Sequence, residues 1–211
     1  MAELLAEAYA YWASNQGRFW TELGRHVSLS LAALALSVLS CVPLGVWASR
    51  RAGLAQPLIN AVGALRIIPS LAVLFLALPY LGTGFGPALV ALTLLALPPV
   101  LVNTYAGVRG VDRAVVEAAR GMGMSPAQVL TRVELPLALP AIVAGVRTAA
   151  VEVIASATLA AFIGGGGLGI FITRGFALFR PEIMLVGAVP VALLALVAEG
   201  LLGGAQRALS R

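Results

Sequence analysis

The sequence has no lysine, one cysteine and one histidine. A single cysteine permits no disulfide within the chain, and neither Cys41 nor His26 has companions with which to hold a metal ion. We expect Cys41, which lies in an apolar run, to be a small packing residue. Without lysine the chain cannot form a phosphate-binding loop that ends in Gly-Lys-Ser or Gly-Lys-Thr. These absences exclude a disulfide scaffold, a cysteine–histidine metal centre and ATP hydrolysis at such a loop.

Charge is also scarce. Charged residues make up 11% of the chain and hydrophobic residues 60%, whereas soluble proteins carry about 25% charged and roughly 45–50% apolar residues. A soluble fold has too little polar surface with this composition, and a disordered chain would be far less apolar. The net charge of +5 comes from arginines scattered between apolar runs, not from a basic stripe interleaved with aromatics, which argues against nucleic-acid binding. The composition predicts an integral membrane protein.

Long charge-free runs predict five membrane-spanning helices, because about 20 apolar residues cross the hydrocarbon layer of a bilayer. The run 67–108 is too long for one helix, and the glycine-rich turn 81–87 divides it into a hairpin. The segment 105–136 is amphipathic and too rich in charge to span. The expected spans are 27–49, with a kink at Pro43, then 57–80, 87–104, 137–163 and 182–202.

Five spans place the two ends of the chain on opposite sides of the membrane. Residues 1–26 are expected to stay as an outer segment, because Glu3 and Glu7 replace the positive start of a signal peptide. Its aromatic residues suit the membrane interface; they are Trp12, Phe19 and Trp20. With the N-terminus outside, the inner side carries eight arginines (50, 51, 109, 113, 120, 132, 207 and 211) and the outer side four (18, 25, 174 and 180). This excess predicts an outer N-terminus and a cytoplasmic C-terminus.

The polar segment contains a specific pattern. Glu117-Ala118-Ala119 is followed by three residues and Gly123, then by nine residues, Val133, one residue and Leu135-Pro136. This resembles the EAA loop of ABC-importer permeases, in which isoleucine stands at the position of Val133. Six of the seven pattern positions match in identity and spacing. The alternative is an ordinary amphipathic hairpin at the membrane surface.

The residue types of this loop predict its local structure. We expect a short helix over 115–120 that presents Ala118 and Ala119 to a groove, and a left-handed conformation at Gly123. Ser125 is expected to cap a second helix, with Pro126 in its first turn and Pro136 at its end. The resemblance implies that the loop docks onto a separate ATPase subunit. The docking residues would be Glu117, which supplies a charge contact, and Ala118, Ala119, Gly121, Gly123, Val133, Leu135 and Pro136.

A second resemblance is narrower. The segments 65–72 and 161–169 are similar to segments of osmoprotectant importer permeases, whose solutes are glycine betaine, choline and carnitine. Glycine-rich runs like the second also occur in methionine-type permeases, so a methionine or other small-solute importer is the alternative. The resemblance covers about residues 22–203.

The resemblance implies an all-α, MetI-like permease domain that is not itself an enzyme. Two permease chains, identical or paralogous, would pair with two cytoplasmic ATPase subunits and an external substrate-binding protein. ATP and Mg²⁺ would be bound by the ATPase, with no cofactor in this chain, and transport would follow alternating access. An integral membrane enzyme or an ion channel is disfavoured, because the spans hold neither a catalytic cluster of polar residues nor a pore-forming charge pattern.

Arginine within an apolar span is costly, by about 2.5–3.5 kcal/mol or more. One hypothesis places Arg66 on the translocation path or at its cytoplasmic mouth, beside Pro69 and Ser70. The favoured alternative is a structural arginine near the inner face that reaches the interface or pairs with Glu152. Arg147 and Glu152 are five residues apart, which is poor spacing for a pair within one helix, so we expect each to pair with another element.

Two further sets of residues have open interpretations. The run Gly164, Gly165, Gly166 and Gly167 is either a plain turn or a docking site for the external binding protein. Aromatic rings can bind a quaternary ammonium, although packing in the core is the favoured role for these: Phe75, Tyr80, Tyr105 and Phe162.

Overall fold

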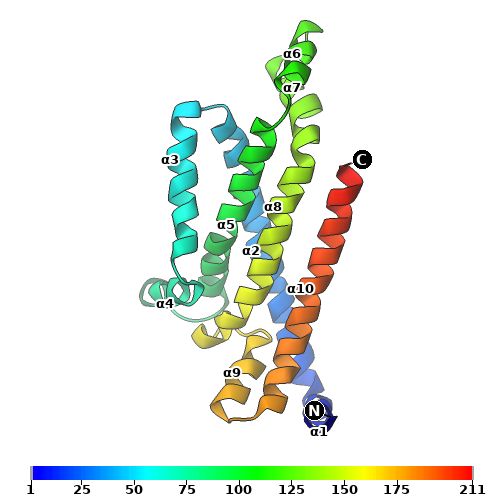
Figure 1. Ribbon diagram of the computed structural model, residues 1–211. Helices are drawn as coiled ribbons and strands as arrows, with labels where there is room; N and C mark the ends of the chain where they lie inside the picture. Colours follow the sequence, from blue (N-terminus) through cyan, green and yellow to red (C-terminus); the bar gives the residue numbers. More distant parts are fainter. Residues whose placement is uncertain (1, 211) are drawn as a thin grey trace.

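The computed structural model describes residues 2–210, and this part of the chain consists of helices and turns without a strand. Four helices are long and apolar enough to cross a membrane: α2 (Gln16–Ser49), α5 (Phe85–Arg109), a continuous helical rod over Pro126–Ile163, and α10 (Pro181–Leu209). They run side by side along the long axis of the molecule (Figure 1). The all-α fold of a multi-pass membrane protein is confirmed.

The segment expected to form one span over 57–80 is instead broken. It consists of α3 (Ala52–Gly63), the 3₁₀ helix η1 (Ala64–Ile67) and α4 (Ser70–Leu81), and the two halves meet at 96°. The break follows from Pro69, because a residue before proline is driven out of the helical region, and Ile68 is extended at φ −80° and ψ 122°. The fifth crossing therefore exists only if both halves are counted as one bent span.

Small residues form much of the core between α2, α5 and the rod. Ala33, Ala91 and Ala149 are fully buried there, together with Cys41, as expected for a packing residue. A Cβ added at Gly145 would lie 2.6 Å from the Cβ of Asn103 on α5, so only glycine fits. Close approach of backbones is how helices associate where lipid removes the hydrophobic driving force between them.

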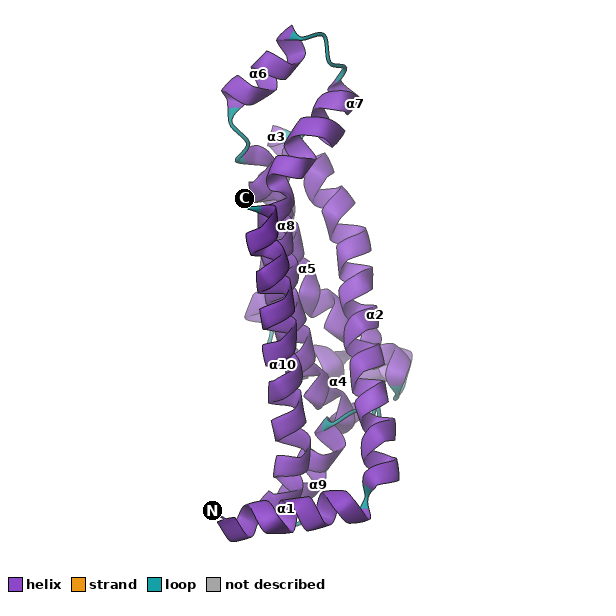
Figure 2. Cartoon of the chain, turned by 90° about the vertical axis from the view of Figure 1, so that its right-hand side faces the viewer, coloured by secondary structure: helices purple, strands orange, loops and turns teal. Residues whose placement is uncertain are grey.

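The N-terminal region is helical throughout its described length. Helix α1 (Ala2–Ser14) lies across the end of the bundle (Figure 2). Phe19 is buried against Phe171 of α9 (Gly169–Ala177), with ring centroids 6.2 Å apart, whereas Trp20 is exposed. Helix α2 already begins at Gln16, within the segment expected as 1–26, and the outer location of that segment stays a prediction.

The opposite end of the bundle carries the polar loop. After α5 come α6 (Arg113–Gly121), α7 (Pro126–Val129) and the π-helical turn η2 (Leu130–Glu134), which leads into α8 (Leu135–Ser156) and the 3₁₀ helix η3 (Ala157–Ile163). Figure 1 shows α6 and α7 projecting from one end, while α1 and α9 lie at the other. Helix α10 extends past the expected end at residue 202 to Leu209, and Arg211, counted in the tail, lies outside the described residues.

Candidate functional site: the projecting loop and the ion pairs along α8

Helix α6 is capped and amphipathic. The Asp112 carboxylate accepts a hydrogen bond from the Ala114 N–H at 2.9 Å, which satisfies one of the free donors at the helix start. Glu117 and Ala118 are exposed, whereas Ala119 is only 2% exposed and packs inward. Successive helical residues point about 100° apart. The expectation that both alanines face one groove is therefore wrong: only Ala118 is on the outer face.

The turn after α6 has the predicted structure. Gly123 is left-handed, with φ +85°, and no atom lies within 4 Å of the position its Cβ would take. Ser125 caps α7 through a reciprocal capping box with Gln128, whose side chain accepts from the Ser125 N–H at 2.8 Å. Pro126 occupies the first turn. Met122 at the tip is 76% exposed; the sequence analysis missed it, although a methionine flanked by glycines at a loop tip is a detectable signal.

Pro136 does not end the helix, contrary to prediction. The π-helical turn Leu130–Glu134 directly precedes it, and the Leu135 N–H bonds back five residues to the Leu130 carbonyl. This wide turn shifts the hydrogen-bond pattern just before proline, a residue that lacks an N–H and crowds the preceding turn of a regular helix. The loop therefore continues through Val133, Leu135 and Pro136 into one rod, without a hinge.

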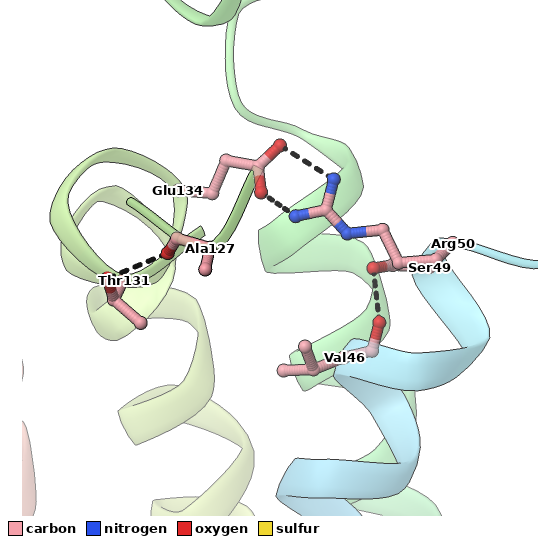
Figure 3. A network of polar contacts seen from close by, with 6 residues as sticks. All are labelled: Val46, Ser49, Arg50, Ala127, Thr131 and Glu134. Atoms are coloured by element: carbon pink, nitrogen blue, oxygen red, sulfur yellow. Dashed lines mark hydrogen bonds and ion pairs between the residues drawn. The ribbon is translucent and has the colours of Figure 1, made fainter. Parts of the chain in front are cut away.

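An ion pair with a buried carboxylate holds this rod against α2. The Arg50 guanidinium binds the Glu134 carboxylate through both of its terminal nitrogens, with Nη1 at 3.2 Å from Oε1 (Figure 3). The Glu134 side chain is 7% exposed, and that of Arg50 is 39% exposed. Two-point pairing of arginine with a carboxylate is both strong and directional. Sequence analysis counted Arg50 only among the inner arginines and did not predict this pair, although an acid between the apolar Val133 and Leu135 was a usable signal.

A cationic cleft of about 340 Å³ separates α6 from the ends of α2 and α5. Arginines dominate its charged lining, and two glutamates offset them in part. The charged lining residues are Arg50, Arg109, Arg113, Arg120, Glu117 and Glu134. The loop thus projects from the bundle, with a capped helix, an exposed outer face and a charged cleft where it joins the bundle.

Two ion pairs lie further along α8. Arg147 contacts Glu199 of α10 at 3.4 Å, and Arg66, at the end of η1, contacts Glu152 at 3.9 Å. Arg147 and Glu152, the two charged residues of α8, therefore each pair with a residue of another element, as expected. The structure shows the Arg66–Glu152 pair that the favoured alternative named, while the position of Arg66 near the inner face stays a prediction.

The glycine run forms a tight turn at the end opposite the loop. Gly164, Gly166 and Gly167 have positive φ, and the Gly167 N–H donates to Oε2 of the buried Glu22 at 2.8 Å. Gly165, Gly166 and Gly167 are buried, and Gly164 is exposed. The turn is therefore packed against α2 and offers little surface of its own, while docking of a binding protein here stays a prediction.

The four candidate aromatic residues do not form a core cluster. Phe75, Tyr80 and Phe162 are exposed on the single chain, and Tyr105 is partly buried. Packing in the core of this chain is therefore the wrong interpretation for the first three. Contact of any of them with a quaternary ammonium stays a prediction.

One known protein family matches most of this chain. Residues 41–211 match the family described as "Binding-protein-dependent transport system inner membrane component". The match includes every residue of the projecting loop and of the rod.

Characterised relatives resemble nearly the whole chain. The choline transport system permease protein OpuBB of Bacillus subtilis is 45% identical over 93% of this chain and 91% of its own length. The carnitine transport permease protein OpuCB of Listeria monocytogenes is 45% identical over 92% of this chain and 88% of its own length. The glycine betaine/carnitine/choline transport system permease protein OpuCB of B. subtilis is 42% identical over 92% of this chain and 89% of its own length.

The fold also resembles solved structures. A chain of the MetNI methionine ABC transporter, in an inward-facing conformation, superposes with a TM-score of 0.84 and 21% identity over 93% of this chain and 98% of that chain. An amino acid ABC transporter solved with histidines gives a TM-score of 0.75 at 20% identity, covering 94% of this chain and 97% of that chain. These likenesses establish the fold.

Proposed function

Since this chain belongs to the family of inner membrane components of binding-protein-dependent transport systems, we propose that it is the permease subunit of an importer for small osmoprotectants that carry a quaternary ammonium group. The observation that carries the proposal is the 42–45% identity to choline, carnitine and glycine betaine permeases over more than nine-tenths of the chain. The methionine alternative has support from fold alone, at 21% identity.

The projecting loop supplies the coupling to ATP hydrolysis. Its exposed Glu117, Ala118 and Met122 dock onto a cytoplasmic ATPase subunit, which holds ATP and Mg²⁺, and this chain catalyses no reaction itself. Gly121 and Gly123 shape the turn, and Val133, Leu135 and Pro136 carry displacement into the rod. Closure of two ATPase subunits moves the rod, and the Arg50–Glu134 pair makes α2 follow it. This motion switches the access of the pathway from one side of the membrane to the other.

The assembly contains two permease chains, two ATPase subunits and one external binding protein. The described residues supply four apolar helices, or five if the bent pair is counted as one span, and a second permease chain completes the pathway. The loop end faces the cytoplasm, because connecting segments with most of the arginines gather there: Arg50, Arg51, Arg109, Arg113, Arg120 and Arg132. The end with α1 and the glycine turn faces outward and receives the binding protein.

Reconstitution tests the transport proposal. The chain, co-expressed with its ATPase and binding protein and placed in proteoliposomes, is expected to accumulate labelled glycine betaine, choline or carnitine only with ATP. Unlabelled methionine is the competitor that separates the alternative: suppression of uptake by methionine alone would overturn the osmoprotectant assignment.

Cross-linking tests the docking face. In a Cys41→Ala background, Ala118→Cys is expected to cross-link to the ATPase subunit, whereas the matched control Ala119→Cys is not, because Ala119 faces inward. Equal cross-linking from both positions, or cross-linking of Ala118→Cys to lipid alone, contradicts the docking geometry.

A further inference from the structure

The ion pair between Arg66 and Glu152 is the loosest polar contact within the apolar helices. Arg66 Nη2 and Glu152 Oε1 are 3.9 Å apart, beyond hydrogen-bond range. The two side chains are 52% and 44% exposed on the single chain. A charged group facing hydrocarbon costs about 2.5–3.5 kcal/mol or more. This face of the bundle therefore meets water or the second permease chain.

The backbone beside the pair leads to the same conclusion independently. The helix is broken between Ile67 and Ser70, with a bend of 96°, and Ile67 is 82% exposed. Irregular backbone at membrane depth is tolerated only where protein buries it or where it lines a water-filled cavity. Because this break is not buried within the chain, it too meets either the second permease chain or water.

We propose that Arg66 and Glu152 form a binding site within the pathway for a zwitterion that carries both a carboxylate and a quaternary ammonium group. The proposal rests on the transport function above and adds the substrate class that the permease itself recognises. No covalent step is involved: the solute enters between the two side chains, and each exchanges its partner for the opposite charge of the solute.

The chemistry of the two groups fits such a solute. The Arg66 guanidinium offers paired N–H donors that match a carboxylate, and the Glu152 carboxylate attracts a quaternary ammonium, which has no N–H to donate. The exchange keeps every charge compensated, whereas leaving one member of a desolvated pair alone is strongly unfavourable. A cation such as choline neutralises Glu152 but leaves Arg66 unpaired, so the site favours zwitterions over cations.

Substitution of Arg66 tests this selectivity. In proteoliposomes that contain the full complex, Arg66→Gln is expected to lower glycine betaine uptake about tenfold more than choline uptake, since losing one charge-assisted interaction corresponds to at least that factor. The matched control is Arg147→Gln, which breaks the neighbouring pair with Glu199 and is expected to lower both uptakes by the same factor. An equal effect of Arg66→Gln on both solutes overturns the site.

A second measurement does not depend on transport rates. Thr148 is exposed and lies one helical turn from Glu152 on the same face of α8. In the Cys41→Ala background, Thr148→Cys in the assembled complex is expected to react with a water-soluble methanethiosulfonate, and glycine betaine is expected to slow the reaction severalfold more than choline at equal osmolality. Absence of labelling, or equal protection by both solutes, overturns the site. Failure of the wild-type complex to take up any osmoprotectant would instead refute the proposed function.

Discussion

The Arg50–Glu134 and Arg66–Glu152 pairs use the same chemical groups in different ways. At the loop end, the two groups bond at two points and the carboxylate is almost fully buried. At the helix break, the charged atoms are 3.9 Å apart and both side chains are about half exposed. The first pair is committed to holding α2 against the rod, whereas the second has spare bonding capacity. Burial and geometry, rather than residue type, separate a structural pair from one that is available to a solute.

Breaking the Arg50–Glu134 pair is expected to have the largest effect on this comparison. Arg50→Ala leaves the Glu134 carboxylate buried without its cation, so we expect a loss of about 3 kcal/mol in stability together with loss of ATP-coupled uptake. Thermal unfolding of the purified complex and uptake assays measure the two effects. Arg51→Ala, the exposed neighbour, is the control and is expected to change stability little. A stability loss from Arg66→Gln as large as that from Arg50→Ala would erase the distinction between the pairs.

The outer end of α2 provides the next test. Glu22→Ala removes the acceptor for the buried Gly167 N–H, and we expect a loss of about 2 kcal/mol, the cost of one unsatisfied buried donor. Thermal unfolding measures it, and Glu7→Ala on the exposed face of α1 serves as the control. Unchanged stability of Glu22→Ala would show that the glycine turn is held by packing alone.

Within the loop, Gly123 and Gly121 form a matched pair. Space around both is open, but Gly123 alone has a positive φ, so Gly123→Ala is expected to cost about 1–2 kcal/mol and Gly121→Ala nothing or a slight gain. Solute uptake and ATPase activity of the assembled complex report whether the strained turn still couples ATP hydrolysis to transport. Gly123→Asn is expected to restore coupling in part, because asparagine tolerates this conformation. Identical behaviour of the two alanine variants would contradict a conformational role.

The smallest effect is expected at Pro136. Because the helix runs through this position, Pro136→Ala is expected to change stability by less than about 0.5 kcal/mol, as at other exposed positions. Unfolding temperature and uptake check this. A severe loss of coupling with an intact fold would show that the proline itself, rather than the π-helical turn before it, directs the rod.

Features that depend on neighbours in the chain were predictable from the sequence. The positive φ of Gly123 and the cap at Ser125 follow from the conformational preferences of single residues. The break before Pro69 obeys the same kind of local rule, although the long apolar run led to the expectation of one continuous span. The continuous helix through Pro136 was not predictable in this way, because a π-helical turn shifts the hydrogen bonds that proline disturbs. The inward orientation of Ala119 depends on where the bundle lies relative to α6, which no local rule contains.

The amino-acid order alone determined that this protein is a helical membrane protein with a projecting polar loop, because hydrocarbon accepts only long apolar helices and rejects clustered charge. Tertiary structure decided which charges meet. Arg50 and Glu134, and likewise Arg66 and Glu152, are more than 80 residues apart in the chain. Only the packing of α2, the broken helix and α8 brings each guanidinium to its carboxylate and sets how much water each pair retains.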